Sequence, residues 1–101
     1  MSKNKVEMFN AIVNKMLDTY RKKNADYGDS FSKSIDEFGY TAALVRMSDK
    51  FNRLKNLLQN DVEAKVKDES VKDTILDLAN YSVMLAIEVE CRDNKKDEGN
   101  E

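Results

Sequence analysis

A stripe of carboxylates on one predicted helix is the part of this sequence with the clearest capacity for chemistry. Glu69, Asp73 and Asp77 are spaced four residues apart, and Asn80 follows three residues later. Because a helix turns by about 100° per residue, this spacing places the four side chains on one narrow face. Carboxylates stacked in this way repel one another and, where they are partly buried, need a compensating cation or hydrogen-bond partner. The alternative is a solvated acidic face near a helix N-terminus, where the helix dipole favours negative charge.

A second polar face combines one acid with three bases. Its members are Arg46, Asp49, Lys50 and Arg53. If this face meets the first one, Asp49, Asp73 and Asp77 converge from two helices as ligands for a hard cation. Arg46, Lys50 and Arg53 then bind phosphates, the arginines by paired hydrogen bonds. Glu69 is the candidate fourth metal ligand or general base, and Glu69 and Asp77 are the candidate catalytic residues.

The same charges have an interpretation that needs no ligand. Ion pairs between Arg46 and Asp73 and between Lys50 and Asp77 would account for both faces. Under this alternative, the two faces stabilise contacts between helices.

Missing residue types restrict the chemistry further. The sequence has no His and one Cys, which excludes histidine-based nucleophilic triads and His/Cys zinc sites. Mg²⁺ is therefore the expected cofactor, with Mn²⁺ as a substitute. The net charge of −2 argues against nucleic acid as a partner, and no apolar run is long enough to predict a membrane span. The lone Cys91 and the polar first residues, which do not form a secretory leader, predict a cytoplasmic protein.

The elements that position these faces are predicted to be helices. The chain of 101 residues has no Pro and three Gly, and its apolar residues recur at helical spacing. We expect an all-α bundle of two to three long helices plus one short helix. The expected segments are a helix over 5–23, a short helix with Phe31, Ile35 and Phe38 buried, a helix over 40–58, and a helix from about 68–70 to 91. Residues 59–67 are expected to be a linker or a weak helical extension.

A single domain over 1–91 and a disordered charged tail over 92–101 are predicted. A chain of this size buries a modest core, so we expect a homodimer or a higher homo-oligomer to complete the bundle.

A polar loop between the first two helices is a further candidate for ligand contact. Tyr27 has the chemistry to stack on a base, and Asp26 or Asp29 has the chemistry to contact a sugar or a metal. The alternative is an ordinary turn with Tyr27 packed against the first helix.

Several runs of sequence resemble known families. The run Asp73-Thr-Ile-Leu-Asp-Leu-Ala-Asn-Tyr resembles the second metal-binding helix of the all-α nucleoside triphosphate pyrophosphohydrolases, the MazG-like and dimeric dUTPase superfamily. Three blocks resemble a small phage-associated family described as a nucleotide-modification-associated domain. These blocks are Lys23-Asn-Ala-Asp-Tyr-Gly-Asp-Ser-Phe, Leu44-Val-Arg-Met-Ser-Asp-Lys-Phe-Asn-Arg-Leu-Lys-Asn-Leu-Leu, and Glu69-Ser-Val-Lys-Asp-Thr-Ile-Leu-Asp-Leu-Ala-Asn-Tyr.

The superfamily resemblance implies a MazG-like fold, Mg²⁺, and hydrolysis of NTPs or dNTPs to a monophosphate and pyrophosphate. The resemblance to the phage-associated family implies a role in phage nucleotide metabolism. Its pattern is a Glu-x-x-Glu helix followed by a Glu-x-x-Asp helix. Asp49 and Asp77 match one acid of each helix, whereas Arg46 and Asn80 stand at the other two positions. Asn80 is then a candidate nucleotide contact. Two readings of the function follow, a pyrophosphohydrolase with a reduced ligand set or a protein that binds nucleotide without hydrolysing it. The alternative to both is a non-catalytic helical interaction protein.

Overall fold

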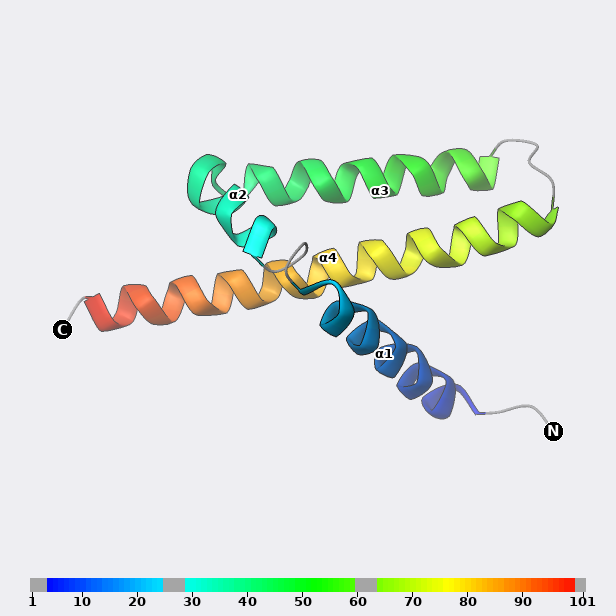
Figure 1. The fold of residues 1–101 in the computed structure, drawn as a ribbon, viewed down its shortest axis with the longest axis horizontal. Coiled ribbons are helices and arrows are strands. Elements are labelled where there is room, and N and C mark those ends of the chain that lie inside the picture. The colour runs from blue at the N-terminus through cyan, green and yellow to red at the C-terminus, as the bar shows by residue number, and fades with distance from the viewer. Residues whose placement is uncertain (1–3, 25–28, 60–63, 100–101) are drawn as a thin grey trace.

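The structure, a computed structural model, describes residues 4–24, 29–59 and 64–99 and is helical over most of these ranges. The helices are α1 (Lys5–Lys22), α2 (Ser30–Phe38), α3 (Thr41–Gln59) and α4 (Ala64–Gly99) (Figure 1). Within α4, side chains are described over 70–94. The prediction of an all-α bundle with two to three long helices plus one short helix is confirmed, and three of the helices are long. No helix within the described ranges is long and apolar enough to cross a membrane.

Helices α3 and α4 form an antiparallel pair and make the most extensive contact in the described structure (Figure 1). Helix α2 packs mainly against α3, and a turn at Gly39 connects the two. Gly39 has φ of 75°, a conformation that favours glycine, and its N–H donates to the carbonyl of Ile35 over 2.7 Å. The predicted end of the short helix at Gly39 is confirmed.

The core lies where α2, α3 and α4 meet. Its fully buried apolar residues are Phe31, Ile35, Ala43 and Met84, and Tyr20, Tyr81 and Leu85 pack against them. The rings of Phe31 and Tyr81 lie 5.8 Å apart in a tilted arrangement. Phe38 is 67% exposed, so the prediction that it is buried is wrong. It is the last residue of α2 and lies past the two residues that reach this core.

Among the described residues, helix α1 contacts this core near its C-terminal end, where Tyr20 packs against it. It contains no buried residue, and its contact with α4 is much smaller than that between α3 and α4. The radius of gyration is 16.4 Å, compared with about 13 Å for a compact domain of this length. The single chain is therefore extended, with its first helix projecting from the α3–α4 pair (Figure 1).

Helix α4 is longer than the sequence predicts at both ends. It begins at Ala64, within the predicted linker, and continues to Gly99 instead of giving way to a disordered tail at Arg92. The sequence contains no Pro, and no Gly occurs between Gly39 and Gly99, so α4 meets no helix-breaking residue before its end. Arg92 also binds Asp36 on α2, with 2.9 Å between its Nη1 and the Asp36 Oδ1.

Candidate functional site

A pocket between α1 and α4 contains part of the predicted carboxylate stripe. Its volume is about 370 Å³, near the lower end of the range for small-ligand sites. Its lining residues are Lys15, Thr19, Lys22 and Lys23 from the C-terminal part of α1, and Asp73, Leu76, Asp77 and Asn80 from α4. We call this the α1–α4 pocket. It places acidic and basic side chains on opposite walls.

Helical spacing explains both walls. Asp73, Asp77 and Asn80 follow at i, i+4 and i+7, so they share one face of α4, as the sequence predicts. The structure confirms that these three residues lie together. Their metal and nucleotide roles stay predictions.

Asn80 connects this wall to α1. Its side chain is 5% exposed, and its Nδ2 donates to the carbonyl of Met16 over 3.4 Å. A buried amide requires hydrogen-bond partners, and this contact supplies one of them. Asn80 therefore helps to hold α1 against α4 at the edge of the pocket.

Asp77 also faces α3. The Lys50 Nζ lies 3.2 Å from the Asp77 Oδ2, and the two side chains are 31% and 32% exposed. The ion pair predicted by the ligand-free alternative is therefore confirmed for Lys50 and Asp77. Asp77 lies where the α1–α4 pocket meets the α3–α4 contact.

Arg46 contacts α2 in place of the predicted partner Asp73. Its Nη2 donates to the Ser34 Oγ over 2.8 Å, and its guanidinium lies over the Phe31 ring, 5.7 Å from the centroid. This arrangement combines a hydrogen bond with a cation–π contact. Arg46 thus supports the α2–α3 packing and does not line the α1–α4 pocket.

The three predicted metal ligands do not form one group. Within the described part of the chain, no three His, Cys, Asp or Glu side chains are placed to hold a metal ion. Asp73 and Asp77 line the pocket, whereas Asp49 and the predicted phosphate ligand Arg53 are exposed on α3 and do not. The Glu69 side chain and residues Asp26 and Tyr27 lie outside what the structure describes. Their predicted roles stay predictions.

Comparison with family models gives one match, to nucleotide modification associated domain 1, over residues 23–89. This chain belongs to that family. The matched range includes α2, α3, the α4 wall of the pocket and every residue that the sequence predicts for the site. No curated protein and no solved structure matches the chain. The likeness to the MazG-like superfamily stays a resemblance in sequence.

Sequence reasoning missed the basic wall of the pocket in this member of the nucleotide modification associated domain 1 family. Lys15, Thr19 and Lys22 repeat the i, i+4, i+7 spacing of the acidic wall. That shared spacing is a signal in the sequence, but which helix faces α4 is decided by tertiary packing. Lys22 also pairs with Asp18 over 3.1 Å, in a contact whose side chains are 74% and 64% exposed.

A second polar cluster, between α2 and α4, was also missed. Arg92 donates to the Glu88 Oε1 over 2.9 Å and to the Ser32 carbonyl over 3.2 Å, in addition to its pair with Asp36. Ser32 donates to the same Glu88 oxygen over 3.0 Å. Burial lowers the pKa of Arg92, but the hydrogen bonds and negative charges of Asp36 and Glu88 outweigh it and raise the pKa above its ordinary value. The cluster fixes α2 on α4.

Proposed function

We propose that this member of the nucleotide modification associated domain 1 family binds a nucleotide in the α1–α4 pocket. The observation that carries the proposal is the meeting of two kinds of ligand group in one pocket. Lys15, Lys22 and Lys23 supply positive charge for phosphate oxygens, and Asp73 and Asp77 supply carboxylates. The exposed Lys22–Asp18 pair is a weak competitor, because exposed pairs contribute little free energy.

The carboxylates fit a magnesium ion that arrives with the nucleotide. Mg²⁺ is usually held by one or two protein carboxylates together with substrate phosphates, and it keeps several waters. Asp73 and Asp77 are the residues that would hold it, and Mn²⁺ would bind in the same way. Bound there, the ion would neutralise phosphate charge. The Asp77 carboxylate would then bind the ion and Lys50 together, or bind the ion in place of Lys50.

Binding is the part of the proposal that the geometry supports most directly. Pyrophosphohydrolysis is a more specific proposal than nucleotide binding, and it requires more than the two carboxylates that line the pocket. Asp49 stands outside the lining, and Asp77 already compensates Lys50. Pyrophosphate release from NTPs and dNTPs is the assay that tests for pyrophosphohydrolysis.

A non-catalytic interaction protein is the second candidate function. The Lys50–Asp77 pair favours it, because this pair accounts for two predicted site residues without a ligand. The uncovered apolar side chains of α1 favour it as well. Under this reading, nucleotides leave the stability of the protein unchanged.

Thermal stability across a panel of NTPs and dNTPs, with and without Mg²⁺ or Mn²⁺, separates the two candidates. A ligand at 100 times its dissociation constant stabilises by about 2.7 kcal/mol. For a domain of this size, that is a shift of ten degrees or more. We expect a shift that depends on both nucleotide and metal.

Matched variants locate the binding site. Asp73→Asn removes a pocket carboxylate, and Asp93→Asn makes the same change at an exposed position further along α4. Lys15→Met and Lys55→Met make an equivalent pair for the cations, since Lys55 is exposed on α3. The proposal predicts that Asp73→Asn and Lys15→Met reduce the shift and that the two controls keep it. Equal shifts in melting temperature for all four variants would overturn the proposal. So would an unsubstituted chain whose melting temperature no nucleotide changes.

A further inference from the structure

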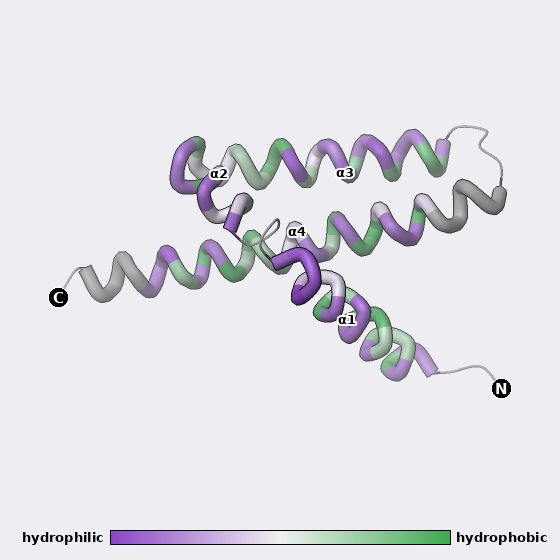
Figure 2. Tube along the Cα trace, in the orientation of Figure 1, coloured by the Kyte–Doolittle hydropathy of each residue, from purple (hydrophilic) through white to green (hydrophobic). Residues whose placement is uncertain are grey.

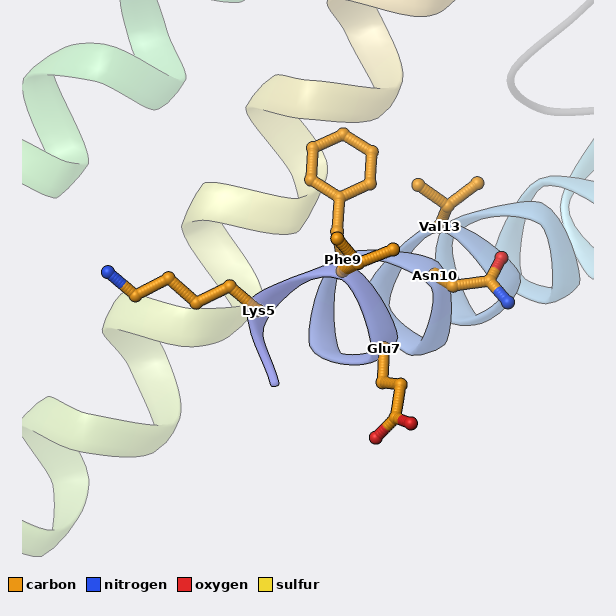
Figure 3. A pocket seen from close by; sticks show the side chains of 6 residues that line it. Lys5, Glu7, Phe9, Asn10 and Val13 are labelled. Atoms are coloured by element: carbon orange, nitrogen blue, oxygen red, sulfur yellow. The ribbon is translucent and has the colours of Figure 1, made fainter. Parts of the chain in front are cut away.

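Helix α1 presents a continuous apolar surface that the described structure leaves uncovered. The residues of this surface, which we call the α1 apolar face, are Val6, Met8, Phe9, Ile12, Val13 and Leu17. Their exposed fractions range from 40% for Val13 to 80% for Val6. Phe9 and Val13 project from the same side of the helix, and Glu7 projects from the opposite side (Figure 3). A hollow of about 710 Å³ lies beside the N-terminal part of this surface, and its described lining residues, which include Val6, Phe9 and Val13, belong to α1.

The C-terminal end of α1 is covered by its own chain. Tyr20 packs against the core, and the Met16 carbonyl accepts the Asn80 hydrogen bond. Towards the N-terminus, hydrophobic residues continue along α1 where it diverges from α4 (Figure 2). The helix is therefore amphipathic over its whole length but packed over only part of it.

The uncovered area is large for a monomer. At ordinary side-chain surface areas, these exposures leave on the order of 600 Å² of apolar surface on α1, at the upper end of the largest patch on a typical monomer. A stable interface buries about 800 Å² on each partner. The α1 apolar face therefore supplies most of the area that each copy of a stable dimer buries.

The remainder of the chain favours a partner that is always present. Among the described residues, the buried apolar core consists of Phe31, Ile35, Ala43 and Met84. That core is small for 101 residues, and the radius of gyration of 16.4 Å is that of an extended chain. A fold completed only by association needs its partner as soon as it forms. A second copy of the same chain meets this requirement.

The charges of α1 favour an antiparallel arrangement of two copies. The N-terminal half carries Lys5 and Glu7, and the C-terminal half is basic, with Lys15, Asp18, Arg21 and Lys22. An antiparallel pairing keeps the two basic halves apart, whereas a parallel pairing would set them side by side. Antiparallel pairing is also what a two-fold axis across α1 produces.

We propose that the α1 apolar face packs against the same face of a second copy, forming a two-fold symmetric dimer. Self-association through α1 is independent of nucleotide binding. Either property can fail while the other holds.

Sedimentation velocity of the full chain across a range of concentrations tests the dimer. We expect a mass of twice 11.6 kDa for the original sequence. Phe9→Glu places a charge in the centre of the α1 apolar face and should yield a helical monomer. Asn14→Glu adds the same charge at an exposed polar position of α1 and should remain dimeric.

Cysteine cross-linking keeps the test decisive if Phe9→Glu fails to fold. In a Cys91→Ser background, Val13→Cys should form a disulfide-linked dimer under oxidation, and Asn14→Cys should form much less. A chain that stays monomeric at all concentrations would overturn the proposal and assign the face to a different partner. A dimer that persists in Phe9→Glu and gives no disulfide cross-link in Val13→Cys would also overturn the proposal.

Discussion

Breaking the ion pair between Lys50 and Asp77 should destabilise the fold measurably, because the pair joins α3 to α4 and is mostly shielded from water. Two unit charges 3.2 Å apart attract by about 5 kcal/mol at an effective dielectric constant of about 20. Desolvation and the ordering of both side chains offset most of this attraction, and exposed pairs retain 0.2–1 kcal/mol. With side chains only 31% and 32% exposed, we expect a coupling free energy of about 1 kcal/mol for this pair.

A double-mutant cycle with Lys50→Met and Asp77→Asn measures the coupling. The unfolding free energies are obtained from urea titrations monitored by circular dichroism. A matched cycle is available in Lys22→Met and Asp18→Asn, since that pair has a similar separation of 3.1 Å but is 74% and 64% exposed. We expect about 0.4 kcal/mol for the exposed pair, as for other i, i+4 pairs.

The two couplings should also differ in their response to salt. Raising the salt concentration to about 1 M should remove most of the exposed coupling and less of the shielded one. A Lys50–Asp77 coupling no larger than that of Lys22–Asp18 would refute the reasoning. So would a rise in stability for Asp77→Asn alone, which is the result expected of a repelled metal ligand.

Three further substitutions test other contacts. Phe31→Ala should lower the unfolding free energy in urea titrations by about 3–5 kcal/mol, because Phe31 is 1% exposed and central to the core; a loss under ~1 kcal/mol would contradict that placement. Arg92→Lys should lower the unfolding free energy in thermal melts by about 1–2 kcal/mol, since an ammonium lacks the planar guanidinium that binds Asp36, Glu88 and the Ser32 carbonyl at once. An unchanged melting temperature would contradict the role of this cluster in fixing α2 on α4. Asn80→Asp should lower the unfolding free energy by roughly 1–3 kcal/mol, because the hydrogen bond to the Met16 carbonyl is lost. The new carboxylate beside Asp73 and Asp77 should tighten metal binding measured by calorimetry, and no gain in metal affinity would count against the pocket as a cation site.

The helices could be predicted because their signals are local. Apolar periodicity placed α1 to within one residue and α3 to within one residue at each end, and Gly39 marked the end of α2. Phe38 was misplaced because its spacing matches that of Phe31 and Ile35, whereas the extent of the core beneath α2 depends on tertiary packing. The ends of α4 were missed because weak periodicity at 59–67 and high charge after Arg92 suggest loops, although no residue there forbids a helix.

The site was predictable on one wall only. Spacing alone groups Asp73, Asp77 and Asn80, and charge complementarity alone suggested the Lys50–Asp77 pair. The opposite wall depends on how α1 crosses α4, which no local pattern specifies. Arg46 shows the same limit, since its contacts with Ser34 and Phe31 depend on the position of α2.

Isothermal titration calorimetry of a nucleoside triphosphate with Mg²⁺ tests the central claim most directly. We expect saturable binding to the unsubstituted chain, a marked loss of affinity in Asp73→Asn, and unchanged affinity in Asp93→Asn. The absence of a binding heat at ~1 mM nucleotide, a concentration that half-fills a site with a binding free energy of about −4 kcal/mol, would contradict it. Equal binding by the two variants would contradict it as well, because the α1–α4 pocket would then not be the nucleotide site.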